Sequence, residues 1–116
     1  MRLGVLAGIS SDWETDLEKV KIAEDLGYEF VGTGEAWGAS SIPWLTAIAL
    51  NTSKIQIGTA ILNVFSRTPA AIAQDFAVLD QLSAGRMVLG LGSSGKNVIE
   101  QFHGVPFKKP LRRLRE

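Results

Sequence analysis

The segment Gly90–Asn97, GLGSSGKN, holds the densest group of residues that could take part in chemistry, and its spacing fits three kinds of site. Gly90-x-Gly92-x-x-Gly95 matches the dinucleotide fingerprint G-x-G-x-x-G, in which bare backbone approaches a pyrophosphate. Gly90-x-x-x-x-Gly95-Lys96 matches a phosphate-binding P-loop up to Asn97, where a P-loop has Ser or Thr. The third possibility is a glycine-rich loop at the carboxyl end of a parallel strand, where α/β folds bind ligands.

The elements that must position this segment alternate between strand and helix. Short apolar runs predict strands over residues 2–7, 29–33, 54–61 and 86–91. Helical spacing predicts helices over residues 11–26, 43–50 and 69–84, a helical turn at 98–102 and the start of a fourth helix at 110. Ser11-x-x-Glu14 predicts a capping box at the first helix, and Gly27 and Gly85 predict helix ends. This order predicts a parallel sheet with right-handed crossovers.

The order of elements excludes two of the three sites. A dinucleotide fingerprint opens the first strand–helix–strand unit and has an acidic residue about 20 positions later. Here the loop follows the fourth strand, and the acidic residue near that distance is Glu116, in a basic helical segment. A P-loop needs the hydroxyl that Asn97 lacks and a later strand that ends in Asp. A glycine-rich loop after the strand is what remains, and it could bind a ligand or serve only as a turn.

Composition narrows the classes of function further. The 116 residues predict one domain, and the 12 basic and 12 acidic residues balance, so no nucleic-acid partner is expected. No cysteine is present, and His103 is the one histidine, which excludes a cysteine site or a two-histidine metal site within the chain. We expect a structural or surface role for His103. No apolar run approaches the roughly 20 residues of a membrane span, so we expect no membrane partner and a cytoplasmic location.

Basic residues crowd the C-terminal segment. They are Lys108, Lys109, Arg112, Arg113 and Arg115. Such a cluster is typical of one solvated face of a helix, and it could also contact phosphate or an acidic surface.

Four blocks of the sequence, in order, resemble one family: Ala23–Gly38 (AEDLGYEFVGTGEAWG), Ile55–Gln74 (IQIGTAILNVFSRTPAAIAQ), Leu79–Gly95 (LDQLSAGRMVLGLGSSG) and Phe102–Glu116 (FHGVPFKKPLRRLRE). They resemble the N-terminal part of the bacterial-luciferase-like monooxygenase superfamily, especially its deazaflavin-dependent oxidoreductases. The family fold is a TIM (β/α)8 barrel of about 250 residues. The resemblance implies that residues 1–116 form a single half-barrel domain, a (βα)4-type α/β unit with four parallel strands and flanking helices.

The resemblance also implies a cofactor, either FMN or a deazaflavin coenzyme of the F420 type, across the carboxyl ends of the strands. Its ring would rest on a bulge after the third strand, with a non-prolyl cis peptide that falls by position at Ala60–Ile61. The implied catalytic residues are Glu35 and Ser93. The implied cofactor-binding residues are Ala7, Gly8, Glu35, Ala60, Ile61, Asn63, Gly92, Ser93, Ser94, Gly95 and Asn97.

This sequence departs from the family pattern at two of these places. Several relatives carry an acid–histidine pair where Glu35-Ala36 stands here, and some carry an acid in the place of Ser93. Trp37 could wall the ring or substrate, or could pack as a partly exposed aromatic. Arg67 could pair with Asp75 or with Glu35, and the sequence does not choose.

The function that the resemblance implies is hydride transfer between the cofactor ring and a small organic substrate. A half-barrel leaves two sheet edges and one sheet face open, so we expect self-association into a homodimer or higher homo-oligomer. The alternative is a truncated, engineered or ancestral-type half-barrel that self-associates, binds the cofactor weakly or not at all, and does not catalyse.

Overall fold

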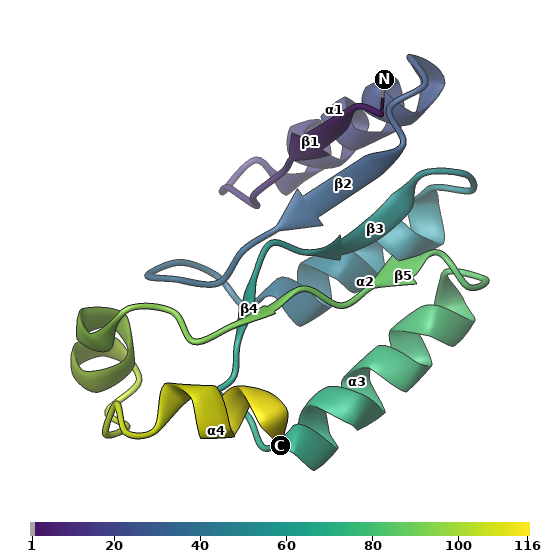
Figure 1. Ribbon diagram of the computed structural model, residues 1–116. Helices are drawn as coiled ribbons and strands as arrows, with labels where there is room; N and C mark the ends of the chain where they lie inside the picture. The colour runs from purple at the N-terminus through teal and green to yellow at the C-terminus, as the bar shows by residue number, and fades with distance from the viewer. Residues whose placement is uncertain (1) are drawn as a thin grey trace.

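The computed structural model describes residues 2–116 and contains one four-stranded parallel sheet (Figure 1). The strands lie in the order β1 (Gly4–Leu6), β2 (Phe30–Thr33), β3 (Gln56–Thr59) and β5 (Met87–Val88). Two shorter strands, β4 (Leu62–Asn63) and β6 (Leu91–Gly92), form a second parallel pair. The predicted α/β fold with four parallel strands in one sheet and flanking helices is confirmed.

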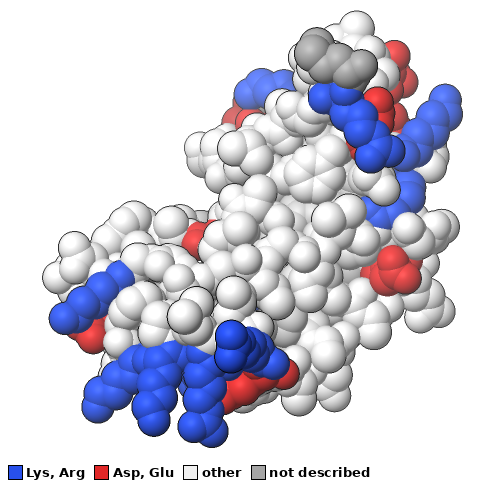
Figure 2. Space-filling model, viewed as in Figure 1, with Lys and Arg blue, Asp and Glu red and all other residues white. Residues whose placement is uncertain are grey.

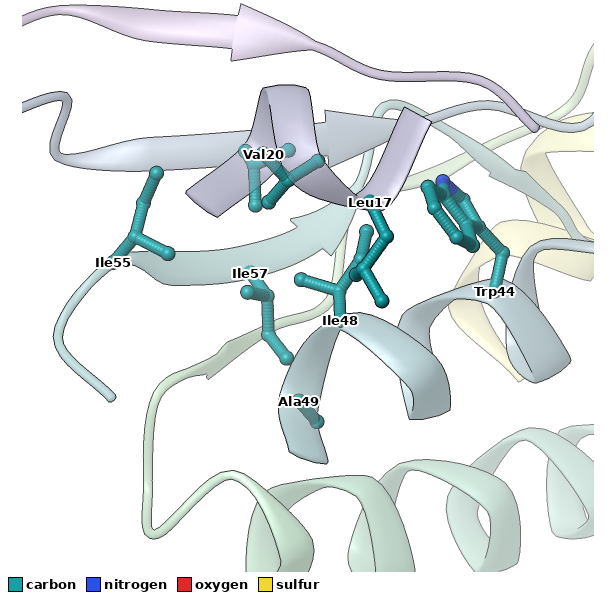
Figure 3. Close-up of a cluster of buried hydrophobic side chains, with 8 residues drawn as sticks. Leu17, Val20, Trp44, Ile48, Ala49, Ile55 and Ile57 are labelled. Carbon is teal, nitrogen blue, oxygen red and sulfur yellow. The ribbon is translucent and has the colours of Figure 1, made fainter. Parts of the chain in front are cut away.

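Helices α1 (Trp13–Asp25), α2 (Ser41–Asn51) and α3 (Pro69–Leu82) cover one face of this sheet (Figure 1). The register aligns Val5 with Val31, Val31 with Ile57, and Ile57 with Met87. Because side chains alternate between the two faces of a strand, this row of apolar residues points at the helices. The core that results contains Leu17, Val20, Val31, Trp44, Ile48, Ala49, Ile55 and Ile57 (Figure 3).

The opposite face of the sheet carries no helix. Leu6 is 73% exposed and Val88 is 38% exposed on this face. The ring of Phe30 lies on this face. A Cβ added to Gly32, in the same strand, would lie 2.8 Å from the ring, and one added to Gly58, in the neighbouring strand β3, would lie 3.1 Å from it. Glycine at these two positions therefore leaves room for the Phe30 ring.

The first helix begins differently from the prediction. The side chain of Asp12 accepts a hydrogen bond from the Thr15 backbone N–H at 3.3 Å, so Asp12 is the N-cap. The predicted capping box of Ser11 and Glu14 is wrong by one position, because Asp12 is also a strong capping residue. Within this helix Leu17 is buried, whereas Trp13 is 48% exposed.

The third and fourth predicted strands are each divided in two. The peptide bond Ala60–Ile61 is cis and separates β3 from β4. Residues Leu89 and Gly90 separate β5 from β6, where a Cβ on Gly90 would lie 2.1 Å from the Thr59 carbonyl oxygen. The two interruptions lie side by side, since the Leu62 N–H donates to the Gly90 carbonyl at 2.8 Å.

The C-terminal part contains a π-helical turn η1 (Val98–Phe102) and a short helix α4 (Pro110–Arg115). The basic cluster lies over α4 and is visible at the lower edge of Figure 2. Arg112 and Arg113 form exposed ion pairs with Glu116, and the Arg113 guanidinium lies 5.8 Å from the centre of the Phe65 ring. None of the helices within residues 2–116 is long and apolar enough to span a membrane.

Two charged side chains, Glu24 and Arg86, form hydrogen bonds at the amino-terminal end of the sheet. The Glu24 carboxylate accepts hydrogen bonds from the backbone N–H groups of Ser53, Lys54 and Ile55, just before β3. Burial alone would raise the pKa of Glu24, but these donors and the nearby Arg86 lower it below its usual value of 4.5. Arg86 itself donates to the carbonyl oxygens of four residues, Ala49, Thr52, Ile55 and Ser83, and so ties the end of α2 to β3 and β5.

Candidate active site at the carboxyl ends of the strands

The predicted site residues lie at one end of the sheet, at or beyond the carboxyl ends of its strands. Ala7 and Gly8 follow β1, and Glu35 follows β2. Ala60 and Ile61 form the cis peptide between β3 and β4, and Asn63 belongs to β4. Gly92 ends β6, and Ser93, Ser94, Gly95 and Asn97 follow it.

The cis peptide joins three of these positions directly. The Glu35 backbone N–H donates to the Ile61 carbonyl at 3.1 Å. The Ile61 side chain occupies the space beside Gly92, since a Cβ added there would lie 3.0 Å from Ile61 Cδ1. Ala60 is exposed, so the bulge presents a small methyl group at the open edge.

The Glu35 carboxylate is held by an ion pair and by α2. Arg67 Nη1 donates to Oε2 at 2.8 Å and Arg67 Nη2 donates to Oε1 at 3.0 Å, which makes a two-pronged pair. The Ser41 backbone N–H at 2.7 Å and the Ser41 hydroxyl at 3.0 Å also donate to Oε1. Arg67 lies 3.7 Å from Asp75 as well, so it contacts both of the partners that the sequence allowed, and Glu35 is the closer one.

These contacts fix the charge state of the pair. Burial alone would raise the pKa of Glu35, but the hydrogen bond from Arg67, the Ser41 backbone donor and the charge of Arg67 hold it below its usual value of 4.5. The same hydrogen bond raises the pKa of Arg67, against a smaller opposing effect of burial. Glu35 is therefore an ionised carboxylate that bridges the loop after β2 to the loop after β4. Its geometry is that of a positioning residue, and its predicted catalytic role stays a prediction.

Asn63 is fully buried, at 0% exposure. Its Oδ1 accepts from the backbone N–H groups of Phe65 at 3.2 Å and Ser66 at 2.8 Å, and its Nδ2 lies 3.4 Å from His103 Nε2. The amide thus shapes the loop that carries Arg67 and makes its remaining contact with the segment after η1.

The glycine-rich loop after β6 turns sharply. Ser94 has a φ of 57°, in the left-handed region, and the Ser93 hydroxyl donates to the Ser94 carbonyl at 3.4 Å. Gly95 and Asn97 are exposed, and a Cβ on Gly95 would meet nothing within 4 Å. The loops at the carboxyl ends of the strands, from Ala7 and Gly8 after β1 to Gly95 and Asn97 after β6, form a rim. At its other end, a Cβ added to Gly8 would also meet nothing within 4 Å. The backbone is therefore accessible to a ligand from both sides of the bulge.

A pocket of about 300 Å³ lies beside the bulge. It is lined by Glu35, Ala36, Gly38, Ala39, Ser40, Ser66, Arg67, Phe102 and His103. Most of these residues were absent from the predicted site. Arg67 could have been included because of its possible pairing with Glu35, whereas His103 joins the pocket only because the chain turns back after η1. Within residues 2–116, no three side chains of His, Cys, Asp or Glu lie together in an arrangement that could hold a metal ion.

Comparisons with known proteins decide the family. The model of the luciferase-like monooxygenase family matches residues 1–116. This chain belongs to the luciferase-like monooxygenase family. Among the family's proteins, a Mycobacterium tuberculosis protein classed provisionally as a coenzyme F420-dependent oxidoreductase is 40% identical over all of this chain and 34% of its own length.

Two solved structures share this fold. The coenzyme F420-dependent tetrahydromethanopterin reductase of Methanopyrus kandleri superimposes with a TM-score of 0.75 and 32% identity, over 92% of this chain and 30% of that one. A type II Baeyer–Villiger monooxygenase of Pseudomonas putida, in complex with FMN, superimposes with a TM-score of 0.83 at 21% identity, over 99% of this chain and 36% of that one, and this shows a shared fold. The present chain spans about a third of the length of these luciferase-like relatives.

Proposed function

We propose that residues 1–116 act as a half-barrel domain of a deazaflavin- or flavin-dependent oxidoreductase. The observation that carries this proposal is the exposed bulge at Ala60, between β3 and β4 at the carboxyl ends of the strands, in a chain that belongs to the luciferase-like family. A deazaflavin or flavin bound there supplies the acceptor or donor for a hydride. The substrate of that transfer is a small organic molecule.

The rim fits a flat ring. Ala60 projects only a methyl group from the bulge, and Gly8 and Gly95 leave open space around their backbones. The Ile61 side chain fills the space beside Gly92, so the bulge packs against β6 there. A surface of small residues and accessible backbone is what the close approach of a planar ligand requires.

The charged and polar residues of the site hold this surface in place. Glu35 links the bulge, through its backbone, to Arg67 and α2, through its carboxylate. Asn63 holds the next loop through the N–H groups of Phe65 and Ser66. Preorganised loops on both sides of the bulge reduce the entropy that is lost when ligand and substrate are positioned. We propose that Ser93, on the rim after β6, makes a polar contact to the reacting ligand.

The relatives favour the deazaflavin coenzyme over FMN. The Mycobacterium tuberculosis protein at 40% identity and the Methanopyrus kandleri reductase at 32% identity are both described as coenzyme F420-dependent, whereas the FMN-bound monooxygenase is 21% identical and shares only the fold. We therefore expect coenzyme F420 to bind more tightly than FMN.

Fluorescence titration with coenzyme F420 and with FMN tests this proposal. We expect saturable F420 binding that Ala60→Leu weakens at least tenfold, a loss of about 1.4 kcal/mol, because the larger side chain would project from the bulge. Ala77→Leu, an exposed position on α3, is the matched control and leaves binding unchanged. Absence of binding by either cofactor, or equal binding by both variants, would refute the assignment of the rim.

A second candidate function is cofactor binding without turnover. It is favoured by the Glu35 carboxylate, whose oxygens are both occupied by Arg67 and Ser41, and by the buried Asn63. The change in coenzyme absorbance on addition of small alcohols and carbonyl compounds separates the two candidates. Binding without any such change would support the second candidate, and turnover would exclude it.

We also propose that the uncovered sheet face pairs with a second copy of the chain. Leu6 and Val88 expose apolar surface there, and the strands β1 and β5 are edges of the four-stranded sheet. Analytical ultracentrifugation of the 116-residue chain at micromolar concentration should show a dimer. Leu6→Lys should make it monomeric, whereas Ile22→Lys, on the exposed side of α1, should not. A monomeric wild-type chain would contradict this part of the proposal.

A further inference from the structure

The pocket beside the bulge contains a histidine whose two ring nitrogens are placed differently. His103 Nε2 lies 3.4 Å from Asn63 Nδ2, and this is the one hydrogen bond to the ring among the described residues. Every buried side-chain nitrogen or oxygen of residues 2–116 has a partner, so Nδ1, which has none, lies at the surface. His103 also lines the pocket of about 300 Å³.

The hydrogen bonds of Asn63 determine which nitrogen of the ring carries the proton. Two backbone N–H groups, those of Phe65 and Ser66, donate to one end of the Asn63 amide, so this end must be the oxygen. The end that faces His103 is therefore the NH₂ group, which only donates. His103 Nε2 must accept, and the neutral ring carries its proton on Nδ1.

The other residues that line the pocket determine which kind of ligand can accept a hydrogen bond from Nδ1–H. The two terminal nitrogens of Arg67 already donate to Glu35, Ser40 and Ser66, and the charges of Arg67 and Glu35 compensate each other. The wall next to His103 is aromatic: the Phe102 ring lies 5.1 Å from the imidazole at 78°, and Trp37 lies edge-on to Phe102 at 5.9 Å. The pocket thus combines one N–H donor with a flat apolar wall and a compensated ion pair.

We propose that His103, held by Asn63 as the Nδ1–H tautomer, donates a hydrogen bond to the oxygen of an uncharged, planar carbonyl compound in this pocket. A carbonyl oxygen accepts from Nδ1–H, its flat substituent packs on Phe102, and the compensated charge of Arg67 and Glu35 gives no preference to an anion. His103 is then a substrate-positioning residue. The inference rests on the proposed function only in naming the ligand a substrate.

The tautomer can be measured directly because the chain has one histidine. Long-range ¹H–¹⁵N correlation spectra of the cofactor-free chain, recorded with the ring in its neutral form, should show a protonated Nδ1 and an unprotonated Nε2. Asn63→Asp keeps the acceptor for Phe65 and Ser66 but replaces the donor that faces His103 with a second oxygen. This variant should move the proton to Nε2. An Nε2–H tautomer in the wild-type chain would overturn the proposal.

Ligand preference is tested with acetophenone as the probe, again without cofactor. Acetophenone should shift the Nδ1 resonance and bind at least tenfold more tightly than toluene, which has the same flat ring without an oxygen, and more tightly than benzoate. His103→Phe retains an aromatic ring and removes the donor, so it should abolish the preference for acetophenone over toluene. Equal binding of acetophenone and toluene by the wild-type chain, or an unchanged preference in His103→Phe, would refute the proposal. Because no cofactor is present, failure of the cofactor assignment would leave these results unaffected.

Discussion

The ion pair between Glu35 and Arg67 gives the most direct test of how the rim is held. In Glu35→Gln, the side-chain oxygen can still accept from Ser41, but an NH₂ group replaces the oxygen that receives Arg67 Nη1 at 2.8 Å. A donor would then face a donor. Removing one partner of a buried pair typically costs about 3–5 kcal/mol, because the other charge is left uncompensated.

For Glu35 and Arg67 the expected cost in free energy of unfolding is lower than this range. The Arg67 side chain retains 20% of its exposure and has Asp75 at 3.7 Å, so part of its charge stays solvated or paired after the change. The loss of charge-assisted hydrogen bonds worth about 1.5–3 kcal/mol, offset by this residual solvation, gives an expected decrease of about 2 kcal/mol in the free energy of unfolding. This corresponds to roughly a thirtyfold change in the unfolding equilibrium constant, since about 1.4 kcal/mol is a factor of ten.

Urea unfolding followed by tryptophan fluorescence measures the change. Trp44 is 2% exposed and donates to the Ala7 carbonyl at 3.1 Å, so it reports on the packing of α2 against the site. Asp75→Asn is the matched control: it removes the more distant, more exposed partner of Arg67 and should cost less than about 0.5 kcal/mol, as exposed pairs do. Adding Arg67→Met to Glu35→Gln should cost less than the sum of the two single changes.

Equal stabilities of Glu35→Gln and the wild-type chain would refute this reasoning, as would a cost of Asp75→Asn as large as that of Glu35→Gln. Additive costs of Glu35→Gln and Arg67→Met would show that the two side chains do not act as a pair.

Three further predictions concern pH and backbone packing. Because the pKa of Glu35 in the folded chain lies below its usual 4.5, the stabilisation by Glu35 is complete above pH 4.5 and is lost as the pH falls through the folded value. The difference in stability between the wild-type chain and Glu35→Gln should therefore shrink in acid. A difference that stays constant in urea titrations down to pH 3 would contradict this prediction. The Ser10 hydroxyl, Lys19 and the Ser10 backbone N–H lower the pKa of Asp16 to about 2, so NMR titration should place its carboxyl midpoint there, and Ser10→Ala should raise it towards 3.8; an unchanged midpoint would rule out the Ser10 hydroxyl as a cause. Gly90→Ala places a Cβ 2.1 Å from a backbone oxygen and should lower the urea midpoint strongly, whereas Gly38→Ala, with nothing within 4 Å of the new Cβ, should not; similar midpoints would show that the strand interruption adapts easily.

Local signals predicted the order of elements well. The helix that the sequence places at residues 43–50 is α2. Helical spacing on α3 predicts an apolar stripe of Ile72, Phe76, Leu79 and Leu82, of which the first three are buried and Leu82 is 41% exposed. These features follow from periodicity, since the side that packs on a sheet must be apolar at helical spacing. Where two capping residues compete, as with Ser11 and Asp12, sequence alone does not choose, because the side chain that reaches the free N–H groups depends on the path of the preceding loop.

The interruptions of the strands were less accessible to the sequence. The runs at residues 54–61 and 86–91 are continuous in hydrophobicity, so each predicts one strand. The structure divides the first at Ala60–Ile61 and the second at Leu89–Gly90, where Gly90 lies against the Thr59 carbonyl. Only the family resemblance pointed to the cis peptide.

For this protein, the sequence by itself determined the parallel α/β order, the family, and the position of the glycine-rich segment Gly90–Asn97 after the fourth predicted strand, because these depend on periodicity and on matching blocks along the chain. Tertiary structure alone decided that Glu35 chooses Arg67 and Ser41 as partners, and that Asn63 faces His103 across 40 positions. The physical reason is that hydrogen bonding and charge pairing act over a few ångströms in space. Spacing along the sequence does not reveal which loops the fold brings within that distance.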